Sequence, residues 1–94
     1  MKCIVYWEYA PEDIEKVIAK DKEQHARMEQ DPNWLGKYLF PAHSTGQCEG
    51  FSIVEVNQEQ MTTAQAFWFP LMKLTFVPII ATSERIKASM KLKK

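Results

Sequence analysis

Residues 2–9 read KCIVYWEY, and both alternating sets of side chains in this stretch are largely apolar. One set begins with Cys3 and Val5, and the other begins with Ile4 and Tyr6. Alternation with a period of two predicts a β-strand, and a strand with two apolar faces must be covered on both. This stretch therefore predicts a central strand of a sheet that has a further layer on each side.

The residues that follow predict a long amphipathic helix from Pro11 to about Gln30. Proline suits the first turn of a helix, because its missing N–H would have had no partner there. The apolar residues then keep the spacing of one helix face, with the polar Asp21 and His25 on this face or beside it. We therefore expect two polar side chains at the edge of the buried surface.

Three further strands are predicted after this helix, over residues 34–42, 51–56 and 74–80. The middle one is apolar on both faces, which again indicates a central strand. The other two contain Pro41 and Pro78, and proline cannot donate a hydrogen bond to a strand ladder. These two segments are therefore predicted to lie at the edges of the sheet.

Two more helices are predicted in the second half of the chain. Asn57 followed by Gln60 has the pattern of a capping box, and the helix that it opens ends at Pro70. A short final helix is expected from Glu84 to about Met90. The order of elements is thus β-α-β-β-α-β, followed by one short helix.

This order predicts an α+β fold of the ferredoxin-like type, with a four-stranded antiparallel sheet and both long helices on one face. The other face stays bare in a monomer, and its apolar area exceeds what monomers expose. We therefore expect a homodimer in which two sheets face each other as a dimeric α+β barrel. The bare face is expected to carry the following residues or the set that alternates with them: Ile4, Tyr6, Tyr38, Val54, Val56, Val77 and Ile79.

Length and charge narrow the classes of function. The 94 residues make one domain, and the 12 basic residues balance the 12 acidic residues. No overall field attracts nucleic acid or an acidic membrane, so neither is an expected partner. A basic cluster at the end of the chain is expected to be a solvated helix end rather than a phosphate site: Arg85, Lys87, Lys91, Lys93 and Lys94.

The expected location is the cytoplasm. No stretch reaches the roughly 18 apolar residues of a membrane span, and the first residues do not resemble a signal peptide. Cys3 and Cys48 form no CxxC pattern, which fits a reduced compartment better than a disulfide or zinc framework. The three glycines form no phosphate-binding loop, and no cofactor is expected.

The second half of the chain carries a resemblance to known proteins, in residues 50–55, 68–71 and 76–80. The residues that bear the likeness are Gly36, Gly50, Glu55, Trp68 and Pro78. The chain resembles the dimeric α+β barrel superfamily, which includes muconolactone isomerase and the antibiotic-biosynthesis-type monooxygenases. It is more closely similar to a family of small proteins of this fold catalogued as a domain of unknown function. The resemblance implies the dimeric fold and transfers no catalytic motif.

One candidate catalytic pair is His25 with Glu55. The C-terminal half of the first helix returns to the end of the sheet where Glu55 lies, so the two meet if Glu55 faces the helices. A histidine bonded to a carboxylate is suited to general acid or base work, with Trp34 and Met61 as apolar walls. The alternative is structural, with His25 reaching solvent and Glu55 pairing with Lys2.

A candidate ligand pocket lies between the sheet and the helices, where this fold often keeps a cavity. The residues expected to line it are largely aromatic: Trp7, Trp34, Tyr38, Met61 and Trp68. The alternative is that the same side chains form a packed core. A third possibility is a His43 and Cys48 nucleophile in the hairpin loop at residues 43–50. No metal site is expected, because His25 and His43 are predicted at opposite ends of the sheet.

Three functions stay open on the sequence alone. The first is a homodimeric protein that binds a small apolar or aromatic molecule. The second is a cofactor-independent enzyme of the isomerase or monooxygenase kind that uses His25 and Glu55. The third is a structural or interaction module with a packed interior and no ligand site.

Overall fold

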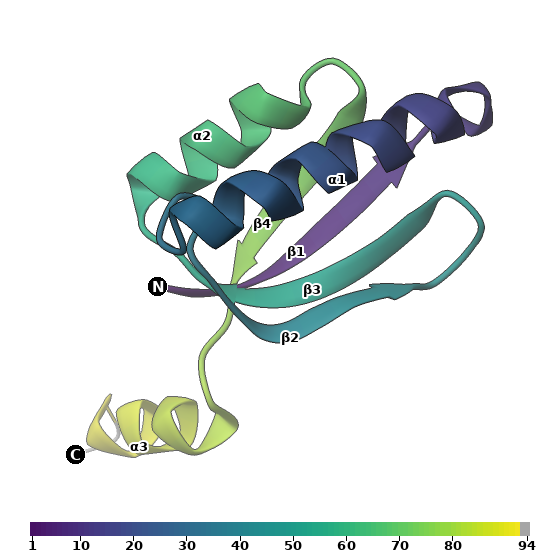
Figure 1. Cartoon of the computed structure of the whole chain (residues 1–94). Coiled ribbons are helices and arrows are strands. Elements are labelled where there is room, and N and C mark those ends of the chain that lie inside the picture. Colours follow the sequence, from purple (N-terminus) through teal and green to yellow (C-terminus); the bar gives the residue numbers. More distant parts are fainter. Residues whose placement is uncertain (93–94) are drawn as a thin grey trace.

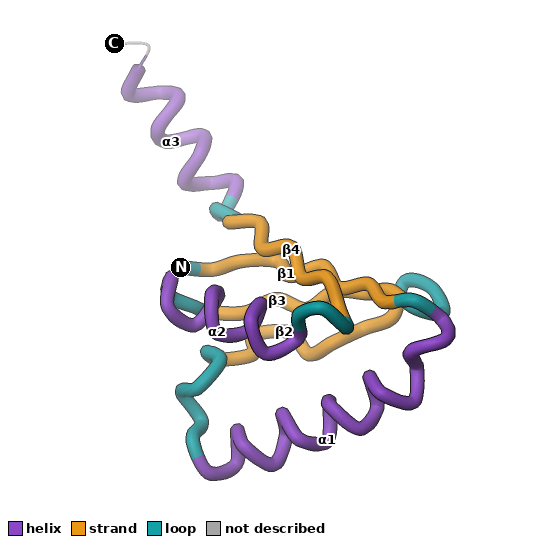
Figure 2. The backbone as a smooth tube through the Cα atoms, turned by 90° about the horizontal axis from the view of Figure 1, so that it is seen from above, coloured by secondary structure: helices purple, strands orange, loops and turns teal. Residues whose placement is uncertain are grey.

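A computed structural model describes residues 1–92, and it places two long helices on one face of a four-stranded antiparallel sheet (Figures 1 and 2). The strands lie in the order β2-β3-β1-β4, so the predicted central and edge strands are confirmed. The elements are β1 (Lys2–Tyr9), the one-turn 3-10 helix η1 (Pro11–Asp13), α1 (Ile14–Gln30), β2 (Lys37–Ser44), β3 (Glu49–Glu55), α2 (Gln58–Trp68), β4 (Met72–Pro78) and α3 (Thr82–Leu92).

The start of α2 confirms the predicted capping box. The Asn57 side chain accepts a hydrogen bond from the Gln60 backbone N–H at 2.8 Å, and the Gln60 side chain accepts one from the Asn57 N–H at 2.9 Å. The Gln60 amide also donates to the carbonyl of Asn33 at 2.7 Å. This one side chain therefore caps α2 and ties it to the turn that leads into β2.

The edge strands begin at other residues than predicted. Gly36 has a φ of 92°, and a Cβ there would lie 2.5 Å from the carbonyl oxygen of Glu55. The chain thus makes a glycine-dependent turn before β2, which begins at Lys37 rather than at residue 34. Farther along, the register of β2 against β3 shifts twice between Tyr38 and His43, around the proline at position 41.

The two faces of the sheet are fixed by the pairing of β1 with β3. Cys3 lies opposite Val54 on the helix side, and Ile4 lies opposite Ile53 on the other side. The core under the helices consists of the following residues: Cys3, Val5, Val54 and Val56, with Met61, Leu74 and Phe76 packed against them. The expected bare face was therefore wrong for Tyr38, Val54 and Val56, which lie on the helix side.

The open face, which no helix covers, has four rows of side chains that cross the strands. The rows are Lys37, Glu55 and Lys2; then Phe40, Ile53, Ile4 and Val77; then His43, Phe51, Tyr6 and Thr75; and last Glu49, Glu8 and Lys73. Charged rows thus lie at both ends of the strands, and an aliphatic row and an aromatic row lie between them.

The last helix, α3, extends away from the sheet beyond the end of β4 (Figures 1 and 2). None of its residues is buried, and Ile86 and Met90 are more than half exposed. The expected solvated basic helix end fits Arg85, Lys87 and Lys91, whereas Lys93 and Lys94 lie outside the described residues. Within residues 1–92, no helix has the length and apolar character needed to cross a membrane.

Candidate functional site

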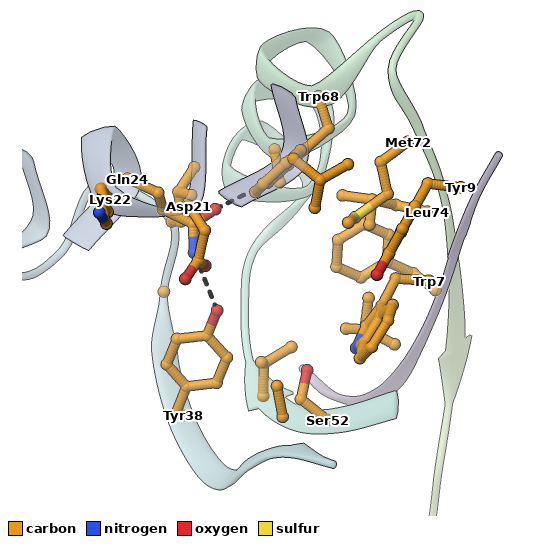
Figure 3. Close-up of a pocket in the computed structure, with 18 of the residues that line it drawn as sticks. Trp7, Tyr9, Asp21, Lys22, Gln24, Tyr38, Ser52, Trp68, Met72 and Leu74 are labelled. Atoms are coloured by element: carbon orange, nitrogen blue, oxygen red, sulfur yellow. Dashed lines mark hydrogen bonds between the residues drawn. The ribbon is translucent and has the colours of Figure 1, made fainter. Parts of the chain in front are cut away.

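A cavity of about 340 Å³ lies between the sheet and the two long helices (Figure 3). Residues of all four strands and of α1 and α2 line it. Its walls are mainly apolar and include Trp7, Trp68, Leu74 and Phe76. The cavity therefore offers an aromatic and aliphatic surface within the fold.

The cavity exists because α1 buries little of its apolar stripe against the sheet. Val17 and Gln24 are its only buried residues, whereas Ile14 and Ile18 are 44% and 51% exposed. Figure 2 shows α1 standing apart from the sheet. The side chains of Val17 and Ile18 line the cavity instead of filling it.

A chain of hydrogen bonds crosses the cavity from α2 through α1 to β2. The indole Nε1 of Trp68 donates to Oε1 of Gln24 at 2.7 Å, and Nε2 of Gln24 donates to the Tyr38 hydroxyl at 3.1 Å. Gln24 is 4% exposed, so this amide is buried and has a partner at each of its two heavy atoms. Gln24 thereby joins α2, α1 and β2.

The Tyr38 hydroxyl remains protonated at neutral pH. Burial raises the pKa of Tyr38, and the Asp21 carboxylate raises it further, while the hydrogen bond from Gln24 acts in the opposite direction. A neutral phenol keeps its proton and can donate a hydrogen bond.

A second hydroxyl belongs to Ser52, which is buried in the middle of β3 on the helix side. Figure 3 shows its oxygen directed into the cavity. The same view places the polar groups of α1 and β2 on one side and the wall of Trp7, Met72 and Leu74 on the other. The cavity therefore has one polar side and one apolar side.

Three of the five predicted ligand-binding residues line this cavity, namely Trp7, Tyr38 and Trp68. Trp34 lies elsewhere, with its ring edge-on to Phe67 at 5.0 Å between centroids. Met61 packs against the core cluster rather than into the cavity. The cavity thus brings three of the five predicted residues together and leaves the other two outside it.

The structure does not bring His25 and Glu55 together, because the condition for their meeting, that Glu55 faces the helices, is not met. His25 is 67% exposed in its side chain and donates through Nδ1 to the Asp21 carbonyl at 2.8 Å. Glu55 lies on the open face and accepts from the N-terminal amine of Met1 at 3.0 Å. The cause is strand alternation: Val54 faces the helices, so its neighbour Glu55 faces away from them.

His43 lies on the open face as part of β2, and its ring stacks on Phe40 at 4.4 Å between centroids. Its Nδ1 donates to the Pro41 carbonyl at 2.7 Å. The backbone carbonyl of Cys48 accepts from the Tyr9 N–H at 3.0 Å, which holds the hairpin loop against the end of β1. Among residues 1–92, no group of three or more His, Cys, Asp or Glu residues is arranged to hold a metal ion.

The sequence interpretation missed Gln24 and Ser52. Gln24 lies seven residues after Val17, which is two helical turns along the same face. This spacing alone could have indicated that Gln24 is buried. Ser52 alternates with Val54 and Val56 on a buried strand face, where a hydroxyl is the exception. In both positions a polar side chain interrupts an otherwise apolar buried set.

Comparisons of the chain with protein-family models, with curated proteins and with solved structures give no match.

Proposed function

We propose that this protein binds a small, largely apolar aromatic molecule in the cavity between the sheet and the helices. The observation that carries the proposal is an apolar cavity of about 340 Å³ with two indole rings in its walls. An apolar cavity of roughly 150 Å³ is enough to hold benzene, and ligand pockets begin at about 300 Å³. The available space therefore suits a ligand of about two fused rings.

Small side chains keep this space open, which favours a binding site over a packed core. Ala64 and Ser52 are both nearly fully buried in the cavity wall, where larger apolar side chains would fill the space. A ligand that fills this space would stabilise the folded chain, because it binds the folded state and not the unfolded one.

The positions of the candidate acid–base residues, His25 and Glu55, also favour binding over catalysis. General acid–base work needs the two groups within hydrogen-bond reach of one reacting molecule. His25 points to solvent on α1, and Glu55 lies on the opposite side of the sheet from the cavity. Neither of them lines the cavity.

We also propose that the protein works as a homodimer in which a second copy covers the open face. Support comes from the order of the rows on this face, with aliphatic and aromatic rows between two charged rows. An apolar centre within a charged rim is the usual anatomy of a protein interface. Tyr6 and Phe40 in these rows are 48% and 39% exposed in one copy.

The two charged rows favour an antiparallel arrangement of the copies. The row of Lys37, Glu55 and Lys2 has one more positive than negative charge, and the row of Glu49, Glu8 and Lys73 has one more negative. If the two-fold axis lies in the plane of the interface and runs perpendicular to the strands, the positive row of each copy lies over the negative row of the other copy. Charges of opposite sign then face each other at both ends.

The ligand proposal is tested by a naphthalene titration followed by NMR. The indole N–H signals of Trp7 and Trp68 are expected to shift saturably, and that of Trp34, which lies outside the cavity, is expected to stay in place. Ala64→Leu fills part of the cavity and is expected to weaken binding at least tenfold. Ala66→Leu adds the same side chain on the exposed face of α2 and serves as the control. No saturable shift in the wild type would refute the proposal.

The dimer proposal is tested by sedimentation equilibrium at micromolar concentration. The wild type is expected at twice the monomer mass, and Ile53→Asp, which places a charge in the aliphatic row, is expected at the monomer mass. Ile86→Asp puts the same charge on the exposed helix α3 and is expected to leave the dimer intact. A wild-type protein that sediments as a monomer would contradict the proposal.

A further inference from the structure

We propose that the ligand is a neutral, planar, two-ring aromatic molecule with a hydrogen-bond acceptor on one edge, and that this acceptor takes its hydrogen bond from the Tyr38 hydroxyl. This inference rests on the proposed function, because it concerns the chemistry of the same cavity. It assigns a direction to the ligand: the acceptor edge faces α1 and β2, and the rings face Trp7 and Leu74 on the opposite wall (Figure 3).

The direction of the hydrogen-bond chain follows from the indole of Trp68. An indole N–H can only donate, so the Gln24 oxygen must be the atom that faces Trp68. The amide nitrogen of Gln24 then faces Tyr38, and the Tyr38 oxygen is the acceptor. Trp68 therefore donates to Gln24, and Gln24 donates to Tyr38. The Tyr38 hydroxyl accepts this last hydrogen bond and still has a proton that it can donate.

This proton has no acceptor among the hydrogen bonds of the described residues. The Asp21 carboxylate also lines the cavity, and its Oδ2 lies 3.5 Å from Nδ1 of His25. Among the described residues, no hydrogen bond joins this carboxylate to the Tyr38 hydroxyl. The Tyr38 hydroxyl thus remains a donor for a ligand, in a cavity that otherwise offers mainly carbon atoms.

The charges at the cavity favour a neutral ligand. Asp21 and Lys22 both line it, and their charges offset each other at this site. An anion bound to Tyr38 would lie beside the Asp21 carboxylate, the group that already disfavours a negative charge on this hydroxyl. A ring nitrogen or a carbonyl oxygen accepts the hydrogen bond without adding a charge.

The test uses naphthalene and quinoline, two probes of nearly the same shape that differ by one ring nitrogen, together with isoquinoline for a different acceptor position. Their dissociation constants are measured by NMR titration with the wild type, Tyr38→Phe and Ser52→Ala. One hydrogen bond is worth about 1 kcal/mol, so Tyr38→Phe is expected to weaken the better nitrogen heterocycle about fivefold. The naphthalene constant is expected to change less than twofold.

Each other outcome has a defined meaning. If naphthalene and both heterocycles fail to bind the wild type, the proposed function itself fails. If naphthalene binds but Tyr38→Phe changes all constants equally, the cavity binds ligands and this inference is wrong. It is also wrong if Ser52→Ala, rather than Tyr38→Phe, removes the preference. Tighter binding of 2-naphthoate than of either heterocycle would overturn the choice of a neutral ligand.

Discussion

Replacing Gln24 by alanine removes the side chain that joins α2, α1 and β2 across the cavity. The Trp68 N–H, on a residue that is 5% exposed, then loses its acceptor. A buried donor without a partner costs about 1–3 kcal/mol, and the one lost methylene group costs about 0.8 kcal/mol. Alanine recovers only a few tenths of a kcal/mol through helix propensity. The expected loss in the free energy of unfolding is about 2.5 kcal/mol.

The loss is measured by urea denaturation followed by far-UV circular dichroism and tryptophan fluorescence. For a domain of this size, about 2.5 kcal/mol corresponds to a fall in Tm of roughly 10–20 °C. Gln30→Ala, at the exposed end of the same helix, is the matched control and is expected to change stability by less than about 0.5 kcal/mol. A double-mutant cycle with Trp68→Phe is expected to give a coupling energy of about 1–2 kcal/mol.

Two results would refute this reasoning. The first is a Gln24→Ala variant as stable as the Gln30→Ala control, because the buried amide would then contribute nothing to the fold. The second is a coupling energy near zero between positions 24 and 68. In that case the loss would come from packing alone and not from the hydrogen bond.

Two further changes probe the site from the sheet side. Gly50→Ala is expected to lower the free energy of unfolding by about 1–3 kcal/mol, because a Cβ there meets the Trp7 ring and a backbone carbonyl. Gly46→Ala in the hairpin loop is the control. Equal stability of the two variants in urea would contradict this account. Because burial raises the pKa of Tyr38 above its usual value near 10, the contribution of Tyr38 to the free energy of unfolding should hold steady up to about pH 10 and fall above it as the unfolded chain ionises first. Tyr38→Phe should flatten that fall, and parallel pH profiles of the two proteins would speak against it.

Much of the fold was predictable because the main signals are local. The alternation in residues 2–9 and in β3 identifies the central strands, and the prolines at 41 and 78 identify the edges. The capping box at Asn57 locates the start of α2 within one residue. The beginning of β2 was missed because it depends on Gly36, whose left-handed conformation is set by the approach of Glu55 from another strand.

The candidate site was less predictable, because it depends on pairing between distant segments. Whether Glu55 or Val54 faces the helices changes with a shift of one residue, and the sequence left both possibilities open. Gln24 was missed for a different reason. A buried amide looks unfavourable on its own, and it becomes favourable only with Trp68 and Tyr38, which are distant in the sequence.

Helix α1 links the cavity to the stability of the whole domain. An apolar stripe normally holds such a helix to its sheet, yet Ile14 and Ile18 remain about half exposed. What holds α1 instead is the Gln24 amide together with two cations above aromatic rings, Lys20 at 4.3 Å from the Phe67 centroid and Arg27 at 4.1 Å from the Trp34 centroid.

These contacts hold the helix at its edges and leave Ile18 about half exposed beside the cavity. An aromatic ligand in the cavity, as proposed above, would give Ile18 apolar contacts that the sheet does not provide. Ligand binding and the docking of α1 would then stabilise each other. A fully packed α1 would leave no room for such a ligand, so the sparse packing of this helix and the proposed binding site depend on the same feature.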